Sequence, residues 1–420
     1  MYRYMRAVAS LAPLALVACG GAEGGARWAG SVTDSAGVRI VSNTDEAMWS
    51  ADGGWTVNEE LRIGTAAGEA EYQFGQISGI GILSDGRIAV LDQQGQHVKL
   101  FSPEGTYLST LGGPGSGPGE IGRGAGPLVV GAADTLVVPD LGNQRVSLLT
   151  PDGESAGSYP IDFREGIPTR WQARPSGRIV SQIRPIGLPN MPAPDTMDAI
   201  VTRASDGSAL DTLLRVRSGR TFSFAGDAPE FNFFVAEPFW TLAGEDGLVF
   251  GVNDEYRLRV FDAAGSEIRQ IRKPFEPSPV TDADRSMFTD LLVKTWEDAG
   301  VPPPQLELLK GAIHFADAFP AYAQFLAGPD GSLWVQRLQT PSSLPEEEKE
   351  NFNPGTSLGS PAWDVFDAEG RYLGVVTMPP RFQPLGFAGD RMYGVWRDEF
   401  DVQYVMIVRV AGPDSEPAAS

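Results

Sequence analysis

Histidine and cysteine, the residue types that most often carry catalysis or bind metals, are almost absent from this sequence. It contains two histidines, His97 and His314, and a single cysteine, Cys19. A structural zinc site needs four convergent His, Cys or carboxylate ligands, and a catalytic zinc site usually takes three from the protein. A Ser-His-Asp triad meets the same shortage of histidine. We therefore predict no catalytic residue, no metal site and no cofactor.

Side chains that can bind a polar ligand recur at one position of a repeated pattern. The predicted ligand-binding residues are Asp92, Asp140, Asn253, Arg337, Trp396 and Arg397. Carboxylate and amide oxygens are the ligands that Ca²⁺ prefers, and convergent polar groups beside an aromatic ring also suit an organic ligand. A second interpretation stays open. Asp92 and Asp140 each precede a turn, and Asp commonly caps the turn that follows it.

The glycine-rich segment Gly112–Gly119 (GGPGSGPG) resembles a phosphate-binding loop only in its glycine content. It lacks the Gly-Lys-Ser/Thr ending and the following helix that cradle a phosphate. We predict a connection between two sheets instead.

The elements that must position these residues are short strands, and Gln76–Leu111 shows their pattern most clearly. Apolar residues alternate over four stretches, which are separated by turns at Asp85-Gly86, Gln94-Gly95 and Glu104-Gly105. Period-two patterning between Gly and Asp-Gly turns predicts an antiparallel meander of four strands. The predicted strands are Ile77–Ile82, Arg87–Leu91, His97–Phe101 and Thr106–Leu111.

The same unit recurs along the chain. In the second unit, Gly126–Ile161, Gly142-Asn143-Gln144-Arg145 repeats the earlier turn, and in both units the outer turn markers are about 19 residues apart. Four further units fit the order of strands, at residues 171–216, 239–271, 322–378 and 385–410. The last of these units lacks a fourth strand.

A strand from the N-terminal region can fill that gap. Val38–Val41 and Trp55–Ile63 are both strand-like, and we expect Trp55–Ile63 to complete the last unit, because closing a ring removes an unpaired sheet edge. The predicted fold class is all-β: a six-bladed β-propeller of four-stranded antiparallel blades, closed by an N-terminal strand. A seventh blade would need a unit hidden in Thr221–Pro238 or Pro274–Pro320.

A small helical insertion is predicted at about residues 281–312. Thr281-Asp282 can cap a helix over Ala283–Asp298, Pro302-Pro303-Pro304 ends it, and a second helix follows around Gln305–Ala312. We expect this insertion to lie over one mouth of the ring.

The first residues have the pattern of a secretion signal. Arg3 and Arg6 precede an apolar run, Ala7–Ala18, that is shorter than the roughly 20 residues a membrane-spanning helix needs. The run ends at Cys19 and resembles the bacterial lipoprotein signal, which implies cleavage before Cys19 and diacylation of its thiol. Gly20 in the next position implies passage to the outer membrane. An ordinary signal peptide with an incidental cysteine is the alternative.

These patterns divide the chain into four parts: a signal peptide (1–18), a lipidated cysteine with a flexible tether (19–37), the propeller (38–411) and a disordered tail (412–420). The formal net charge of −21 argues against nucleic acid as a partner, because phosphate binding needs a basic face. We expect a monomer in the bacterial cell envelope, lipid-anchored, whose acidic surface keeps it soluble.

Two segments, GQHVKLFSPEG and GNQRVSLLTPDG, carry a family resemblance. They resemble the NHL repeat, and the order of elements resembles bacterial six-bladed propeller lipoproteins of the NHL-like class. The resemblance is good over Gln76–Gly153, and His97 and Arg145 occupy the Arg position of the repeat. The third, fifth and sixth units depart from it.

The function expected from these observations is binding. We predict a lipid-anchored extracytoplasmic propeller, non-catalytic, that interacts with a protein, peptide or glycan. The alternative is a metal-dependent hydrolase that resembles Ca²⁺-dependent lactonases of the six-bladed gluconolactonase class, in which Asp140 and Asn253 would be metal ligands. The sequence offers no matching Glu ligand.

Overall fold

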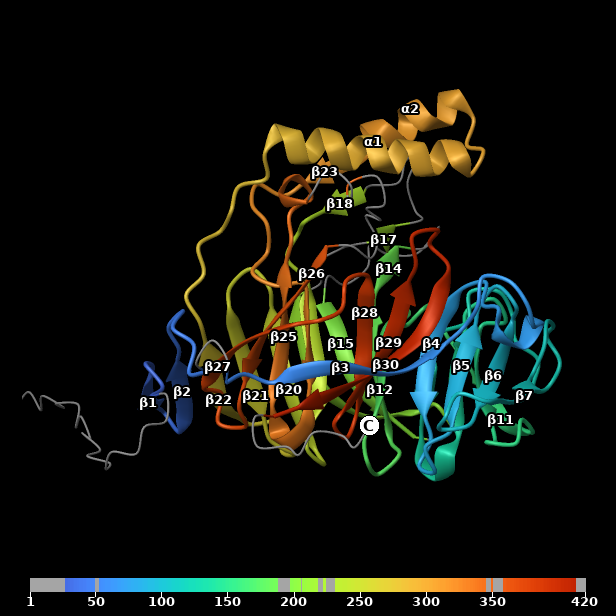
Figure 1. The fold of residues 1–420 in the computed structure, drawn as a ribbon, viewed down its shortest axis with the longest axis horizontal. Coiled ribbons are helices and arrows are strands. Elements are labelled where there is room, and N and C mark those ends of the chain that lie inside the picture. Colours follow the sequence, from blue (N-terminus) through green and yellow to red (C-terminus); the bar gives the residue numbers. More distant parts are fainter. Residues whose placement is uncertain are drawn as a thin grey trace, which may run out of the picture.

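Six four-stranded antiparallel sheets follow one another along the chain and form a ring, as the computed structural model shows (Figure 1). The structure describes residues 27–49, 53–187, 197–204, 206–217, 222–223, 231–344, 349 and 358–412. Each sheet is one blade of a six-bladed β-propeller, which confirms the predicted fold. First strands of successive blades contact each other, so they surround the centre of the ring.

The strands have the following bounds. Blade 1 contains β4 (Ile77–Ile82), β5 (Ile88–Asp92), β6 (His97–Phe101) and β7 (Tyr107–Leu111), and blade 2 contains β8 (Val129–Val130), β9 (Leu136–Asp140), β10 (Arg145–Leu149) and β11 (Ser155–Pro160). Blade 3 contains β12 (Ile167–Ala173), β13 (Ile179–Arg184), β15 (Met197–Arg203) and β16 (Ala209–Arg217), and blade 4 contains β19 (Pro238–Ala243), β20 (Gly247–Val252), β21 (Arg257–Phe261) and β22 (Glu267–Arg272). Blade 5 contains β24 (Gln324–Ala327), β25 (Leu333–Leu338), β26 (Gly359–Phe366) and β27 (Tyr372–Thr377), and blade 6 contains β28 (Phe382–Ala388), β29 (Arg391–Arg397) and β30 (Gln403–Ala411).

The ring is closed by a strand from the N-terminal region. Strand β3 (Thr56–Ile63) pairs antiparallel with β30 and is the fourth strand of blade 6. Its register runs from Thr56 opposite Ala411 to Ile63 opposite Val405. The expectation that this segment completes the last unit is confirmed, and the pairing covers an edge that would otherwise be open.

The other N-terminal strands add to blade 4. The hairpin of β1 (Ser31–Ser35) and β2 (Val38–Ser42) extends its outer edge, with β2 parallel to β22. Asn43 then joins blades 4 and 5, because its side-chain amide donates to the carbonyl oxygens of Arg272 and Gly370. The sequence pattern did not predict this extension, since a parallel pairing across more than two hundred residues leaves no local signal.

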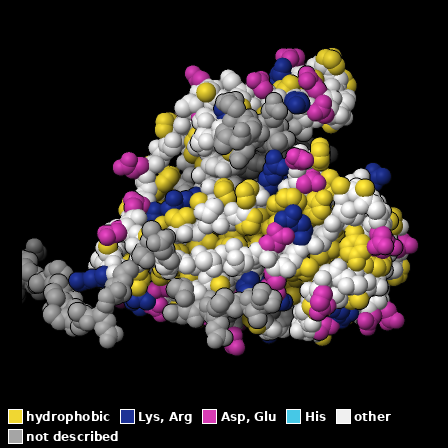
Figure 2. Space-filling view, in the orientation of Figure 1, with side chains coloured by type: hydrophobic (Ala, Val, Ile, Leu, Met, Phe, Trp, Pro, Cys, Tyr) yellow, Lys and Arg dark blue, Asp and Glu magenta, His cyan; other side chains and the backbone are white. Residues whose placement is uncertain are grey.

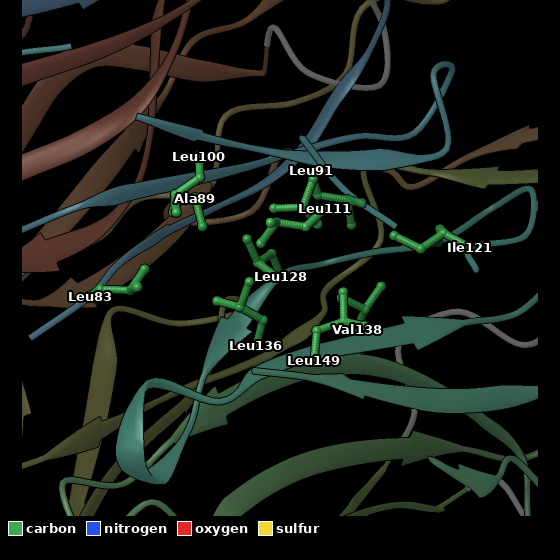
Figure 3. Close-up of a cluster of buried hydrophobic side chains, with 12 residues drawn as sticks. Leu83, Ala89, Leu91, Leu100, Leu111, Ile121, Leu128, Leu136, Val138 and Leu149 are labelled. Atoms are coloured by element: carbon green, nitrogen blue, oxygen red, sulfur yellow. The ribbon is translucent and has the colours of Figure 1, made fainter. Parts of the chain in front are cut away.

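The apolar core lies between neighbouring blades. One cluster joins blades 1 and 2 and is drawn in Figure 3, where side chains from both sheets point toward one another. Four of its side chains are fully buried (0% exposed): Leu91 and Val98 of blade 1, and Leu136 and Val138 of blade 2. Fully burying such a side chain contributes about 1.5–3 kcal/mol, so a single blade, exposed on both faces, would lose most of its stability.

Long insertions extend the fold at one end only. In an antiparallel blade, the connection from the second to the third strand and the connection to the next blade lie at the same end. The longest of these connections are β7 to β8, β13 to β15, β16 to β19, β22 to β24, and β25 to β26. We call this end of the ring the cap end. The opposite end has short turns.

The cap consists of two helices and short strand pairs above the ring (Figure 1). Helix α1 (Asp282–Asp298) and helix α2 (Pro303–Gly311) come from the connection between blades 4 and 5, as predicted. Below them β18 (Phe231–Phe233) pairs with β23 (Ile313–Phe315), and β14 (Ile186–Gly187) pairs with β17 (Phe222–Ser223). The described residues also form four one-turn 3₁₀ helices: η1 (Ala70–Tyr72), η2 (Ala132–Asp134), η3 (Pro329–Gly331) and η4 (Pro341–Ser343).

Helix α1 is fixed in place by its first turn. Thr281 and Asp284 form a capping box, in which each side chain bonds to the backbone N–H of the other. The second oxygen of Asp284 accepts from the N–H of Ser342, 3.0 Å away, in the connection that follows β25. Phe288, which is fully buried, packs with Phe234 in an apolar cluster inside the cap. The cap therefore has a core of its own.

Among the described residues, neither α1 nor α2 has the length and apolar character that crossing a bilayer requires. The signal segment and Cys19 lie outside the described residues, as do residues 20–26 of the predicted tether and the tail beyond Gly412, whereas the rest of the predicted tether is described and contains β1.

Candidate functional site

All six predicted site residues lie at the cap end, because each ends or closely follows a second strand. Asp92 ends β5, Asp140 ends β9, and Asn253 directly follows β20. Arg337, Trp396 and Arg397 lie in the last two positions of β25 and β29. Within the described ranges, no hydrogen bond or ion pair joins any two of the six. The structure therefore places them around one end of the ring without bringing them into one cluster.

Asp92 binds backbone at the end of its strand. Its carboxylate accepts hydrogen bonds from the N–H groups of Gly75 and Gln76 (both 3.0 Å), which lead into β4, and of Gln94 and Gly95 (both 3.1 Å), in the turn after β5. Its exposed fraction is 3%. Burial alone would raise the pKa of Asp92, but these N–H donors lower it. The carboxylate thus holds the strand entry and the turn together.

Asp140 and Asn253 have the same role in blades 2 and 4. Asp140 accepts from the N–H of Gly122 at 2.8 Å and from the backbone of Asn143 at 3.1 Å. The side-chain oxygen of Asn253 accepts from the N–H of Glu237, the residue before β19, at 2.7 Å. Capping of the following turn, the interpretation left open for Asp92 and Asp140, accounts for the bonds from Gln94, Gly95 and Asn143. The bonds from Gly75, Gln76, Gly122 and Glu237 instead join the end of a second strand to the segment before a first strand. A ligand role for the three residues stays a prediction.

Blade 5 uses an arginine in place of this oxygen acceptor. Arg337 donates from Nε (2.9 Å) and Nη2 (2.7 Å) to Asp364 on the third strand, β26. The buried Asp364 also accepts from the hydroxyls of Tyr256 (2.9 Å) and Tyr372 (3.0 Å). Burial opposes charge on the guanidinium, yet the bonds to Asp364 raise the pKa of Arg337. Burial and the Asp364 charge raise the pKa of Tyr256 well above its usual value, so its hydroxyl stays a donor.

Blade 3 contains a similar pair of an arginine and an aspartate, and its arginine is more deeply buried. Arg184, the last residue of β13, donates from Nη2 to Asp198 on β15 (2.8 Å) and to Glu237 (3.0 Å). Gln182 also donates to Asp198, at 2.6 Å, and accepts from the indole N–H of Trp240 at 2.9 Å. Asp198 is 0% exposed. Burying charges is unfavourable unless they are hydrogen-bonded, and Asp198 accepts bonds from both Gln182 and Arg184.

Arg170 lies beside this network on β12, an innermost strand. Its guanidinium stands over the ring of Phe239, 4.9 Å from the centroid, and Nη1 donates to the carbonyl oxygen of Trp240 at 3.2 Å. Burial and the charge of Arg184 lower the pKa of Arg170 to about 10, although Glu237 opposes this, so it is cationic at neutral pH. A guanidinium has five N–H donors. Arg170 can therefore offer donors to an acceptor group at the centre of the cap end.

Blade 6 presents an aromatic side chain to solvent. Its second and third strands are joined by residues 398–402, where Phe400 is 79% exposed. The turn is ordered by Asp398, whose Oδ1 accepts from the N–H groups of Phe400 (2.9 Å) and Val402 (3.0 Å). Figure 1 shows this turn reaching up below the projecting helices. Arg397 donates to Asp401 in the same turn at 3.0 Å.

Trp396 lies behind that turn and is held by polar contacts. Its indole N–H donates to the carbonyl oxygen of Pro380 at 3.0 Å, and its ring packs against Tyr404. The guanidinium of Arg62 on β3 covers the other part of the ring, 3.9 Å from the centroid. Cation–π contacts of this kind hold aromatic rings in place at protein surfaces. Trp396 supports the base of the turn that carries Phe400.

Several of these residues were not predicted. Asp198 and Asp364 lie on third strands, Glu237 in a connection, and Phe400 at the tip of a turn. The only sequence signal for the first two is a buried position occupied by a carboxylate in an alternating strand. Phe400 stands out in the sequence as an apolar residue between acidic ones, DEFDV, where a turn is expected.

No group of three or more His, Cys, Asp or Glu side chains that could hold a metal ion occurs in the part of the chain that the structure describes. The sequence Gly-x-Ser-x-Gly occurs twice, at residues 153–157 and 355–359. The first lies in the turn after β10 and in β11, so it joins strand to strand, whereas a nucleophile elbow joins a strand to a helix. The serine of the second lies outside the described part.

The sequence matches no family model and none of the curated proteins. In structure it is similar to a protein of Bacteroides fragilis NCTC 9343 that is named as exported, with a TM-score of 0.52 and 12% identity over 88% of this chain and 99% of that chain. A member of the DUF4221 family from Bacteroides vulgatus gives a TM-score of 0.51 and 11% identity over 85% and 98%. For a gluconolactonase from Xanthomonas campestris the TM-score is 0.41 and the sequence identity is 13%, over 84% of this chain and 98% of that chain.

These likenesses concern the fold. The two Bacteroides proteins span nearly their whole length on this chain, so the six-bladed architecture is shared from end to end. A fold of this kind is found with many unrelated functions. The function of this chain must therefore be argued from its own cap end.

Proposed function

We propose that this protein is an extracytoplasmic binding module, anchored by lipid at Cys19, that binds a protein, peptide or glycan at the cap end without catalysis. The observation that carries the proposal is the position of the insertions. The long connections lie at one end of the ring, and three of them, β16 to β19, β22 to β24 and β25 to β26, share the apolar core of the cap. Insertions gathered at one end of a rigid fold are expected to form a binding surface there, because binding residues lie disproportionately on loops that a rigid scaffold positions.

The chemistry of that end suits an oxygen-bearing ligand with an apolar part. Arg170 supplies N–H donors at the centre, and Phe400 supplies an exposed aromatic ring at the rim. Aromatic residues and arginine dominate the binding energy of protein interfaces. Figure 2 shows a recess between the overhanging cap and the ring below it, with basic side chains at its inner side.

A photo-crosslinking experiment tests where the ligand binds. A crosslinking amino acid replaces Phe400 in one variant and Leu108 in another, because Leu108 is also exposed (48%) but lies on the outer strand of blade 1. In envelope preparations, the Phe400 position is expected to capture a discrete partner that the Leu108 position does not. Arg170→Met should weaken that capture. Equal capture at both positions, or none at either, contradicts the proposal.

The anchor is tested separately. Cys19→Ala should move the protein from the membrane fraction to the soluble periplasmic fraction, because acyl chains supply the membrane affinity, at roughly 0.8 kcal/mol per buried CH₂. Unchanged membrane association of the variant would contradict lipidation at Cys19. This outcome leaves the cap-end proposal to be judged by the crosslinking alone.

A further inference from the structure

Blade 4 is wider than the other blades, because the hairpin of β1 and β2 adds two strands to its outer edge. Neighbouring strands lie about 4.7–4.9 Å apart, so this edge extends roughly 9–10 Å beyond a four-stranded blade. Figure 1 shows β1 and β2 at the outer margin of the molecule, on the side opposite the strands of blade 1. The hairpin is therefore the outermost part of that side of the ring.

The described chain begins beside this edge and is fixed to it. The indole N–H of Trp28 donates to the side-chain oxygen of Asn43 at 2.8 Å. Asn43 is 6% exposed, and its amide donates to the carbonyl oxygens of Arg272 and Gly370. Between these points β2 pairs with β22. The chain from Trp28 onward therefore leaves the ring only if these bonds break.

A short segment joins this fixed point to Cys19. Only residues 20–26 separate Cys19 from Arg27, where the described chain begins. A fully extended chain spans at most about 3.6 Å per residue, so the path from Cys19 to Arg27 covers no more than about 29 Å. A compact chain of 420 residues is roughly 55 Å across. With acyl chains on Cys19 in the bilayer, the blade 1 side of the ring cannot rest on the membrane.

The edge carries arginines without acidic partners. Arg39 on β2 lies directly opposite Arg269 on β22, and like charges in opposed positions of a sheet repel each other. Burial, and next the charge of Arg39, lower the pKa of Arg269, although Glu369 and Asp367 oppose this. Among the described residues no ion pair joins Arg39 to Asp34, its neighbour on β1, whose carboxylate accepts from the N–H of Gly37 instead.

The three outer strands are locally basic in a chain whose formal net charge is −21. Strands β1, β2 and β22 contain more arginines than acids, with Arg39, Arg269 and Arg272 against Asp34 and Glu267. Glu267 is already paired with Arg259 of β21, and the exposed Arg27 precedes β1. An apolar side chain, Val32, is 43% exposed on the face of the hairpin that also carries Arg39.

We infer that the β1–β2 edge of blade 4 is the surface that contacts the membrane, where its arginines bind anionic lipid headgroups. The inference rests on the proposed acylation of Cys19 and adds an orientation to it. Arginine binds phosphate through parallel N–H bonds, and each basic residue near an anionic surface strengthens binding about fivefold. The ring then stands on its edge, so that the cap end opens sideways and stays accessible to a partner.

The experiment measures fluorescence quenching by lipid in the acylated protein. Cys19 is the only cysteine, and acylation blocks its thiol, so an introduced cysteine alone takes a fluorophore. Thr33→Cys labels β1, Leu108→Cys labels the outer strand of blade 1, and Asp85→Cys labels the end opposite the cap. The proteins are placed in vesicles of phosphatidylcholine and phosphatidylglycerol that contain a headgroup-spin-labelled lipid. The Thr33 label should be quenched at least about threefold more strongly than the other two, since the tether holds it near the surface.

Two arginines test the contribution of charge. Arg27→Gln combined with Arg39→Gln should reduce quenching of the Thr33 label by about half or more, because both are near the anionic surface. Arg123→Gln, at an exposed arginine between blades 1 and 2, should leave it unchanged. The inference is overturned if the Leu108 or the Asp85 label is quenched as strongly as the Thr33 label. It is also overturned if the double variant is quenched as strongly as the Arg123 variant.

The same experiment separates this inference from the proposals on which it builds. A parent protein that itself takes the fluorophore has a free Cys19 thiol, which contradicts the acylation and overturns this inference with it. Preferential quenching of the Thr33 label in a protein whose Phe400 position captures no partner would uphold the orientation and contradict cap-end binding alone.

Discussion

Replacing Asp92 by alanine decides between the two roles that its position allows. The carboxylate accepts four backbone hydrogen bonds, from Gly75, Gln76, Gln94 and Gly95, and its residue is 3% exposed. A buried donor left without a partner costs about 1–3 kcal/mol, and water can reach part of this site once the side chain is shortened. We therefore expect Asp92→Ala to lower the free energy of unfolding by about 3–5 kcal/mol. Asp92→Asn, which keeps one oxygen, should lower it by about 2 kcal/mol.

The assay is urea denaturation followed by tryptophan fluorescence, with Asp85→Ala as the control. Asp85 lies in another turn of the same blade, its side chain is 50% exposed, and it bonds to the neighbouring Arg87. Its replacement should change stability by no more than about 0.5 kcal/mol. If Asp92→Ala were as stable as the parent, the structural role argued from the four N–H donors would be refuted. A stable variant with lost ligand binding would instead establish the ligand role.

Three further predictions concern closure, buried charge and pH. Deleting residues 1–63 removes β3 and leaves β30 as an open edge, so this variant should aggregate in size-exclusion chromatography with light scattering, whereas deletion of 1–54 keeps β3 and should stay monomeric. Asp198→Ala leaves Arg184 buried with half of its partners and should destabilise the protein by about 3–5 kcal/mol in urea, while Asp162→Ala, in an exposed pair with Arg164, should have no measurable effect. Although burial opposes it, hydrogen bonds lower the pKa of Asp92 and of Asp284, so their contribution is present above the unfolded value near 3.9 and is lost as pH falls through the folded values. The Tm should fall on acidification, and less so in Asp92→Ala; a pH-independent Tm would contradict this.

Most strands could be predicted from the sequence because their signals are local. In Gln76–Leu111, period-two alternation and Gly turns locate each strand of blade 1 to within a residue or two. Helix α1 was predicted for the same reason, since its capping box is formed by neighbouring residues, Thr281 and Asp284. The place of β2 on blade 4 could not be predicted, because its partner β22 lies far along the chain and either strand would pair equally well elsewhere by its own pattern.

The candidate site was predictable in position but not in its contacts. That Asp92, Asp140 and Arg337 share one end of the ring follows from the repeat alone. Their partners do not follow, because backbone N–H groups carry no sequence signal and Asp364 is separated from Arg337 by an insertion. The sequence alone therefore does not distinguish a carboxylate that caps a turn from one that binds a ligand, even where the strand before it is predicted correctly.

The blades differ in how they end their second strand, and the difference follows the cap. Asp92 and Asp140 precede short turns and bond to backbone N–H groups within reach, as Asn253 does in blade 4. Blades 3 and 5 carry long insertions at that connection. In both, an arginine near the end of the second strand pairs with an aspartate on the third.

This exchange has a physical reason. A single carboxylate can order a tight turn, but a long insertion leaves its two flanking strands free to separate unless a bond joins them directly. The pairs Arg184–Asp198 and Arg337–Asp364 provide that bond at the base of each insertion. If so, Arg337→Gln, at a half-exposed position, should loosen the blade 5 insertion and increase its amide hydrogen exchange while the exchange of blades 1 and 2 stays unchanged. Uniform protection across the insertion in that variant would show that the apolar core of the cap, and not the ion pair, holds it in place.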